Sequence, residues 1–126
     1  TKDAQYHYKL AKELFSLRKR GVLIMGSGNM VHNLGKLSFD KIDEEYGFDW
    51  AMESNELFKK NIIEHNHSAL IDYENLGYAA QLSIPTPDHY YPLLYTLGLQ
   101  SEKEEAFIFN DTLMGGSITM TSLMIN

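Results

Sequence analysis

The sequence predicts an α/β fold: a single domain with a mixed central sheet flanked by helices. Segments with helical periodicity alternate with short apolar runs, and glycine or proline ends most of these segments. A chain of 126 residues is long enough for one domain with its own core. No composition shift or linker divides it, so we expect residues 1–126 to form one unit.

Helices are predicted where apolar side chains recur every three or four residues. The segments that meet this criterion are 3–20, 50–65, 68–73 and 88–97. Gly21 and Gly98 are plausible stops for the first and last of them, and Asp49 can cap the second. Residues 78–84 fit either a helix or a strand.

Three segments are strand candidates. Residues 22–25 (Val-Leu-Ile-Met) are a continuous apolar run, which is typical of a buried parallel strand, and residues 106–109 (Ala-Phe-Ile-Phe) form a second. The loose alternation of residues 117–125 predicts a closing edge strand. A doubly wound sheet needs more strands than these, so either 78–84 is also a strand or further strands lie in an N-terminal part outside this chain.

Composition excludes several functional classes. The net charge of -6 argues against a nucleic-acid or membrane surface, and no stretch approaches the roughly 20 apolar residues of a membrane helix. The sequence contains no cysteine, which excludes disulfides, thiolate metal sites and a cysteine nucleophile. No signal peptide is recognisable, and we expect a cytoplasmic protein.

Two histidines stand where α/β proteins build their sites. His32 follows the Gly26–Gly28 turn, and His89 follows the Pro-Thr-Pro segment 85–87. Imidazole can bind zinc or iron(II), or transfer protons, so each could be a ligand or an acid/base group. The alternative for each is a purely structural histidine. The Gly-Ser-Gly turn matches neither a dinucleotide nor a Walker fingerprint, and Asp88 appears better suited to capping a helix than to contacting His89.

Four segments, taken in order, carry a resemblance to a known family: 26–34, 49–51, 85–93 and 116–120. Together they resemble the C-terminal half of the class III extradiol ring-cleavage dioxygenases, the LigB-like group, in its 4,5-DOPA dioxygenase branch. The match in order and spacing extends over nearly the whole chain, and the combination is far more specific than any one segment.

The resemblance implies a non-haem metal site that opens catechol rings with O2. By the family pattern, His89 is a metal ligand, and His32 is either the acid/base group or a further ligand. We also expect Ser27, Asn29 and Tyr90 to contact the substrate, a small aromatic diol such as DOPA. The metal is Fe(II) or Zn(II), since imidazole suits both.

The resemblance also implies that this chain holds an incomplete LigB-like fold. Members are about twice as long, and two further histidine ligands belong to their N-terminal half. Because catalytic metals usually have three protein ligands, we expect the chain alone to be inactive. We further expect exposed apolar surface that binds the other half or a second copy. The alternative function is a non-catalytic α/β binding or interaction domain that kept the scaffold.

Overall fold

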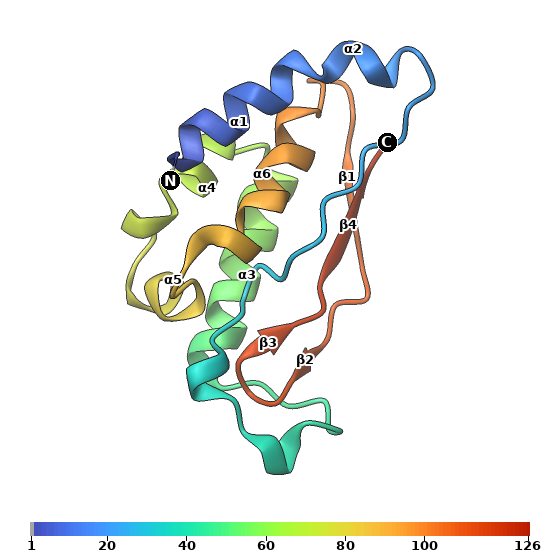
Figure 1. The fold of residues 1–126 in the computed structure, drawn as a ribbon. Coiled ribbons are helices and arrows are strands. Elements are labelled where there is room, and N and C mark those ends of the chain that lie inside the picture. Colours follow the sequence, from blue (N-terminus) through green and yellow to red (C-terminus); the bar gives the residue numbers. More distant parts are fainter. Residues whose placement is uncertain (1) are drawn as a thin grey trace.

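The computed structural model describes residues 2–126, which fold into a layer of helices beside small antiparallel sheets (Figure 1). The helices are α1 (Ala4–Glu13), α2 (Phe15–Arg18), α3 (Asp49–Ile63), α4 (His67–Ile71), α5 (Tyr78–Ser83) and α6 (Tyr91–Gly98). Short 3-10 turns are η1 (Leu34–Lys36), η2 (Phe39–Lys41), η3 (Tyr73–Asn75) and η4 (Pro87–His89). The strands are β1 (Ala106–Phe109), β2 (Leu113–Met114), β3 (Ile118–Thr119) and β4 (Ser122–Ile125).

The first helix begins at a capping residue as expected, but two predictions about the helices are wrong. The Asp3 carboxylate accepts a hydrogen bond from the Tyr6 amide at 2.8 Å and caps α1. The helix predicted over 3–20 is interrupted at Leu14, which separates α1 from α2. Asp49 is not the cap of α3: Phe48 holds that position, and Asp49 lies in the first turn, where a carboxylate favours the helix dipole.

The core forms where α1, α3 and α6 pack together. Gly98 permits the contact between α6 and α1, because a Cβ there would lie 2.7 Å from the Ala11 Cβ and 2.8 Å from the Tyr8 carbonyl oxygen. The largest side chains that are fully buried in this core are Phe58, Ile62, Leu70, Tyr90, Leu94 and Leu97. None of the helices formed by residues 2–126 has the length and hydrophobicity needed to cross a bilayer.

Residues 78–84, which fitted either a helix or a strand, form helix α5. It packs against α3, and the Ser83 hydroxyl donates a hydrogen bond to the Ser54 hydroxyl at 2.8 Å between them. A helix buries the adjacent Ala79 and Ala80 together with Ser83 on the next turn, whereas a strand would point neighbouring side chains to opposite faces.

The α/β class is confirmed, but the sheets differ from the mixed central sheet that was predicted. Within residues 2–126, β1 pairs with β4 and β2 with β3, both antiparallel, as two separate two-stranded sheets. The predicted strands at 106–109 and within 117–125 are present as β1, β3 and β4. A break at Met120 and Thr121 divides the last of these.

The prediction of a buried strand at residues 22–25 is wrong, because most of this segment is exposed. The segment is extended but pairs with no strand of the described residues, and Leu23 and Met25 are 81% and 83% exposed. It runs beside β4 in Figure 1, and Leu23 and Ile24 share a hollow with Leu123 and Ile125. An apolar run is buried as a strand only when its neighbours cover both faces, and among the described residues Leu23 and Met25 lack such cover.

A charged contact joins α2 to the chain after α6. The Arg18 guanidinium donates two hydrogen bonds to the Glu104 carboxylate, at 2.5 and 2.8 Å, and a third to the Leu99 carbonyl oxygen at 2.5 Å. The hydrogen bonds from Arg18 lower the pKa of Glu104 to about 2. The paired carboxylate therefore stabilises the fold at pH values above its unfolded pKa, and this contribution disappears as pH falls toward 2.

Replacing Glu104 by glutamine (Glu104→Gln) tests this contact. We expect the free energy of unfolding at pH 7 to fall by about 1 kcal/mol, because the pair is bidentate but partly open to solvent. The difference from the parent chain should shrink as pH is lowered from 5 to 2, measured by urea unfolding. Glu44→Gln, at the more exposed pair with Lys41, is the control. An effect of Glu104→Gln that is independent of pH would contradict this account.

Candidate functional site

His32 and His89 lie face to face. Their ring centroids are 5.1 Å apart and the ring planes differ by 20°, although 57 positions separate them along the chain. His32 is buried, at 6% exposure, and its amide donates to the Ser83 carbonyl at the end of α5. His89 ends η4, and its side chain is 53% exposed. The fold thus pairs one shielded imidazole with one open imidazole.

Two glycines make this pairing possible. A Cβ on Gly28 would lie 2.2 Å from the His89 carbonyl oxygen, and one on Gly26 would lie 2.6 Å from the Pro92 carbonyl oxygen. Neither glycine has a positive φ, so they serve close packing of two backbone segments. A turn was predicted at residues 26–28, but the structure has an extended segment there, and this segment contacts the His89 segment.

Both ring nitrogens of His32 contact backbone carbonyl oxygens. Nδ1 lies 2.9 Å from the Asn29 oxygen, and Nε2 lies 2.8 Å from the Thr86 oxygen. Because a carbonyl only accepts hydrogen bonds, the two contacts are both favourable when both nitrogens carry protons. In this arrangement neither nitrogen offers a free lone pair to a metal or to a proton donor, so either role would require one of these two contacts to open.

His89 has a different environment. Its Nε2 lies 3.2 Å from the Asp88 Oδ2, and both side chains are more than half exposed. A hydrogen bond from the Thr86 side chain lowers the pKa of Asp88, and the two imidazoles add to the effect. Asp88 had appeared a poor partner for His89, but the 3-10 turn of η4 brings adjacent side chains together. The imidazole of His89 and an ionised carboxylate thus face solvent side by side.

The two histidines line one cavity of about 460 Å³. Its lining residues are Asn29, His32, Asn33, Leu34, Gly35, Pro85, Thr86, Asp88, His89 and Ile118. A volume of this size accommodates a small organic ligand. The lining combines apolar side chains with imidazole, amide and carboxylate groups, as is typical of a site for a small, partly polar molecule.

Curated relatives match almost the whole chain. It is 34% identical to a 4,5-DOPA dioxygenase extradiol of Escherichia coli strain K12 over 131 aligned residues, which cover 99% of this chain and 46% of the relative. A Beta vulgaris protein of the same name is 28% identical over 95% of this chain and 44% of its own length. No family model matches the chain.

The chain is homologous to the extradiol 4,5-DOPA dioxygenases. The resemblance that the four motifs suggested is therefore confirmed. The chain spans about half the length of the curated relatives it matches. A crystal structure of an uncharacterized protein from Escherichia coli K12 superposes with a TM-score of 0.87 at 32% identity, covering 97% of this chain and 50% of that one.

The residues expected to contact substrate lie in three different environments. Asn29 lines the cavity, where its carbonyl oxygen contacts His32 and its side-chain amide donates to the Thr119 carbonyl at 2.6 Å. Ser27 lies outside it, in hollows beside Met25 and Gly26. Tyr90 is the clear correction: it is fully buried between Phe58 and Tyr73, and its hydroxyl donates to the Leu70 carbonyl at 2.8 Å.

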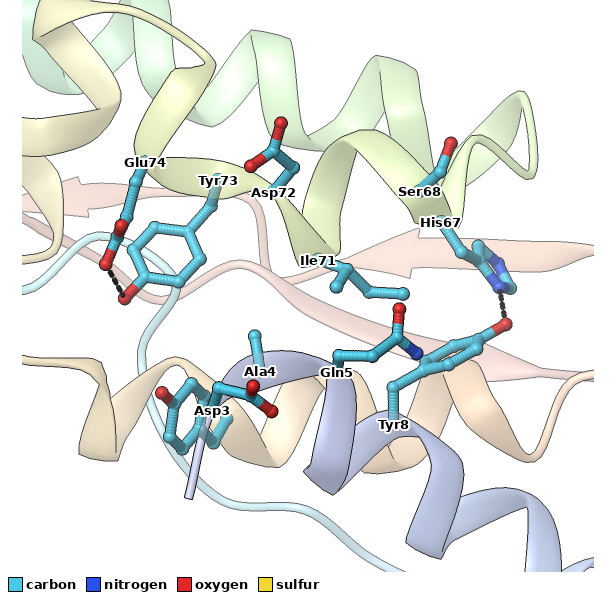
Figure 2. A pocket seen from close by; sticks show the side chains of 11 residues that line it. Asp3, Ala4, Gln5, Tyr8, His67, Ser68, Ile71, Asp72, Tyr73 and Glu74 are labelled. Carbon is cyan, nitrogen blue, oxygen red and sulfur yellow. Dashed lines mark hydrogen bonds between the residues drawn. The ribbon is translucent and has the colours of Figure 1, made fainter. Parts of the chain in front are cut away.

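A larger cavity, of about 630 Å³, lies between α1 and the α4–η3 segment (Figure 2). Its polar groups pair with one another: the Tyr8 hydroxyl with His67 Nδ1 at 2.8 Å, and the Tyr73 hydroxyl with Glu74 at 3.5 Å. Asp3, which also lines it, is occupied as the cap of α1. This hollow shares no lining residue with the cavity of the stacked histidines, and its imidazole, His67, is hydrogen-bonded at Nδ1 to Tyr8.

The described residues place few metal-binding side chains together at the cavity. Among residues 2–126, no three His, Cys, Asp or Glu side chains lie close enough together to hold a metal ion. His89 is an open imidazole of the kind that binds Fe(II) or Zn(II), whereas both nitrogens of His32 are engaged.

Replacing Gly28 by alanine (Gly28→Ala) tests the packing of the two histidine segments. The added methyl group meets a backbone oxygen, which cannot rotate away, so we expect a loss of about 2 to 3 kcal/mol in the free energy of unfolding. The His32 and His89 ring resonances should shift together in NMR spectra. Gly35→Ala is the control, because its nearest atom is a side-chain oxygen at 3.4 Å. Equal effects of the two substitutions would refute the close-packing role.

Proposed function

We propose that this chain supplies the His32–His89 part of a metal-dependent extradiol dioxygenase site that opens catechol-type rings with O2. The observation that carries the proposal is the stacked pair of imidazoles, 5.1 Å apart at an open cavity, in a homologue of 4,5-DOPA dioxygenases. A DOPA-like diol and O2 are the substrates, and Fe(II) or Zn(II) is the metal. The homology and the cavity support this choice over unrelated chemistry.

His32 is the acid/base group in this proposal. A catechol must lose the proton of a hydroxyl before both oxygens become strong ligands, and a histidine can accept and later return that proton. The carbonyl groups of Asn29 and Thr86 hold the ring in one orientation, and one of these contacts opens when the ring exchanges a proton with the diol. Burial at 6% exposure keeps bulk water from exchanging that proton freely.

His89 is the metal ligand of the pair. His89 would hold the metal, which would act as a Lewis acid toward the diol, and Fe(II), unlike the redox-inert Zn(II), would also supply redox chemistry with O2. The Asp88 carboxylate, 3.2 Å from Nε2 of His89, restrains the ring and adds negative charge that favours a cation nearby. The remaining protein ligands come from residues that correspond to the other half of the relatives, so this chain by itself is inactive.

A non-catalytic binding or interaction domain is the second candidate. The observation that favours it is the lack, within residues 2–126, of any group of three metal-binding side chains. The two proposals differ in the expected result of adding a polypeptide that corresponds to the unmatched half of the relatives. A half site should then show dioxygenase activity, whereas an interaction domain should remain inactive.

Metal titration of the chain alone gives the first test. Calorimetry with Zn(II), and with Fe(II) without oxygen, should show weak binding, because one open imidazole and one carboxylate make an incomplete ligand set. His89→Ala should remove the remaining binding, and His67→Ala, a matched histidine outside the site, should not. Tight one-to-one binding by the unmodified chain would contradict the half-site proposal.

Reconstitution gives the second test. The chain is combined with a polypeptide corresponding to the unmatched half of the Escherichia coli 4,5-DOPA dioxygenase, then supplied with Fe(II) and DOPA in air. We expect a yellow ring-opened product and O2 consumption. His32→Ala should reduce the rate roughly 100-fold or more while metal content is kept. His89→Ala should lose both rate and metal. Full activity in both variants would refute the site assignment.

A further inference from the structure

The segment Leu23–Gly28 has the properties of a β-strand without a neighbour. It is extended, and neither its backbone nor its side chains form a hydrogen bond with any part of residues 2–126. Hydrogen bonds resume at Asn29 and His32, immediately before the site. A run of unpaired amides and carbonyls is the template onto which another strand adds.

Apolar side chains surround this unpaired segment. Leu23 and Met25 are 81% and 83% exposed, and the outer face of the β1–β4 hairpin exposes Phe107, Phe109 and Met124 at 61%, 47% and 52%. We call these five side chains, with the backbone of Leu23–Gly28, the open strand face. Apolar groups gathered in this way mark surfaces that another polypeptide covers.

Two hollows run between the open segment and the hairpin. One of about 380 Å³ separates Met25–Met30 from Phe109 and Met120–Leu123, and one of about 140 Å³ separates Leu23 and Ile24 from Leu123–Ile125. The segment and β4 run beside each other in Figure 1 without being hydrogen-bonded. The edge of Leu23–Gly28 is therefore accessible along its length.

The comparisons indicate what covers this face. The chain aligns over 97% of its own length with a solved relative that is twice as long, at a TM-score of 0.87. This chain therefore has the same fold as the matching half of the relative. The other half of the relative's residues has no counterpart in the alignment. The C-terminal end of the open segment packs against His89 through Gly28, and His89 lines the incomplete site. A strand added along the segment therefore ends beside that site.

We propose that the open strand face binds the polypeptide corresponding to the other half of the relatives, which adds a β-strand along Leu23–Gly28. The choice of partner rests on the proposed function, whereas the location of the contact rests on the unpaired backbone and exposed side chains. Backbone hydrogen bonds to residues 23–28 supply the register, and the five apolar side chains supply the buried surface.

Hydrogen exchange with a defined partner tests the proposal. The probe is the unmatched half of the Escherichia coli 4,5-DOPA dioxygenase, both as a separate polypeptide and fused ahead of Lys2. We expect the amides of residues 23–28 to exchange rapidly in the chain alone and slowly with the probe. Unchanged exchange at these residues in both the mixture and the fusion would overturn the proposal.

Substitutions separate the backbone and side-chain contributions. Met25→Pro removes an amide that has no partner in the chain alone, so it should leave the stability of the chain unchanged but weaken probe binding by about tenfold or more. Leu23→Lys should do the same through charge on the apolar face. Phe39→Lys is the matched control, because Phe39 is 77% exposed outside this face. Equal binding by all three variants would overturn the proposal.

The result of the docking test can be distinguished from the result of the activity test. Protection of residues 23–28 without ring opening supports the docking surface and counts against the dioxygenase proposal. Ring opening with residues 23–28 unprotected supports the enzyme and overturns the docking surface. Protection that arises from self-association at high concentration, with no change on adding probe, also overturns it, because a second copy then occupies the face.

Discussion

The site depends on one backbone contact. Gly26 and Gly28 bring an extended segment against the carbonyl oxygens of Pro92 and His89, closer than any side chain would permit. The contact aligns the segment that leads to His32 with the turn that carries His89. Since the two imidazoles come from distant parts of the chain, their 5.1 Å separation follows from this packing and from the bond of the His32 amide to Ser83.

The same packing gives the two histidines unlike chemistry. The buried ring has a carbonyl oxygen at each nitrogen and is suited to holding a proton, while the exposed ring keeps an accessible nitrogen beside a carboxylate. A pair of equivalent, equally exposed imidazoles would compete for one metal ion or repel when protonated.

The helices pack around a continuous core, whereas the strands have edges and apolar side chains that nothing in the described residues covers. The helical layer has a continuous core to which α1, α3 and α6 contribute. The hairpin and the extended segment lack strands on their outer edges and keep large apolar side chains in solvent. This asymmetry matches a chain that spans about half the length of its relatives.

The sequence by itself determined the α/β class, the location of most helices, strands β1 and β4, and the two histidines, because periodicity and motif spacing are local properties. It also identified the family through four ordered motifs. Only the tertiary structure decided that Val22–Met25 is exposed, that Tyr90 belongs to the core, and that Asp88 contacts His89. Apolar composition cannot tell a buried strand from an uncovered one, since burial depends on which neighbours are present. The direction of a side chain next to a site likewise depends on the turn that carries it, and distant packing decides that turn.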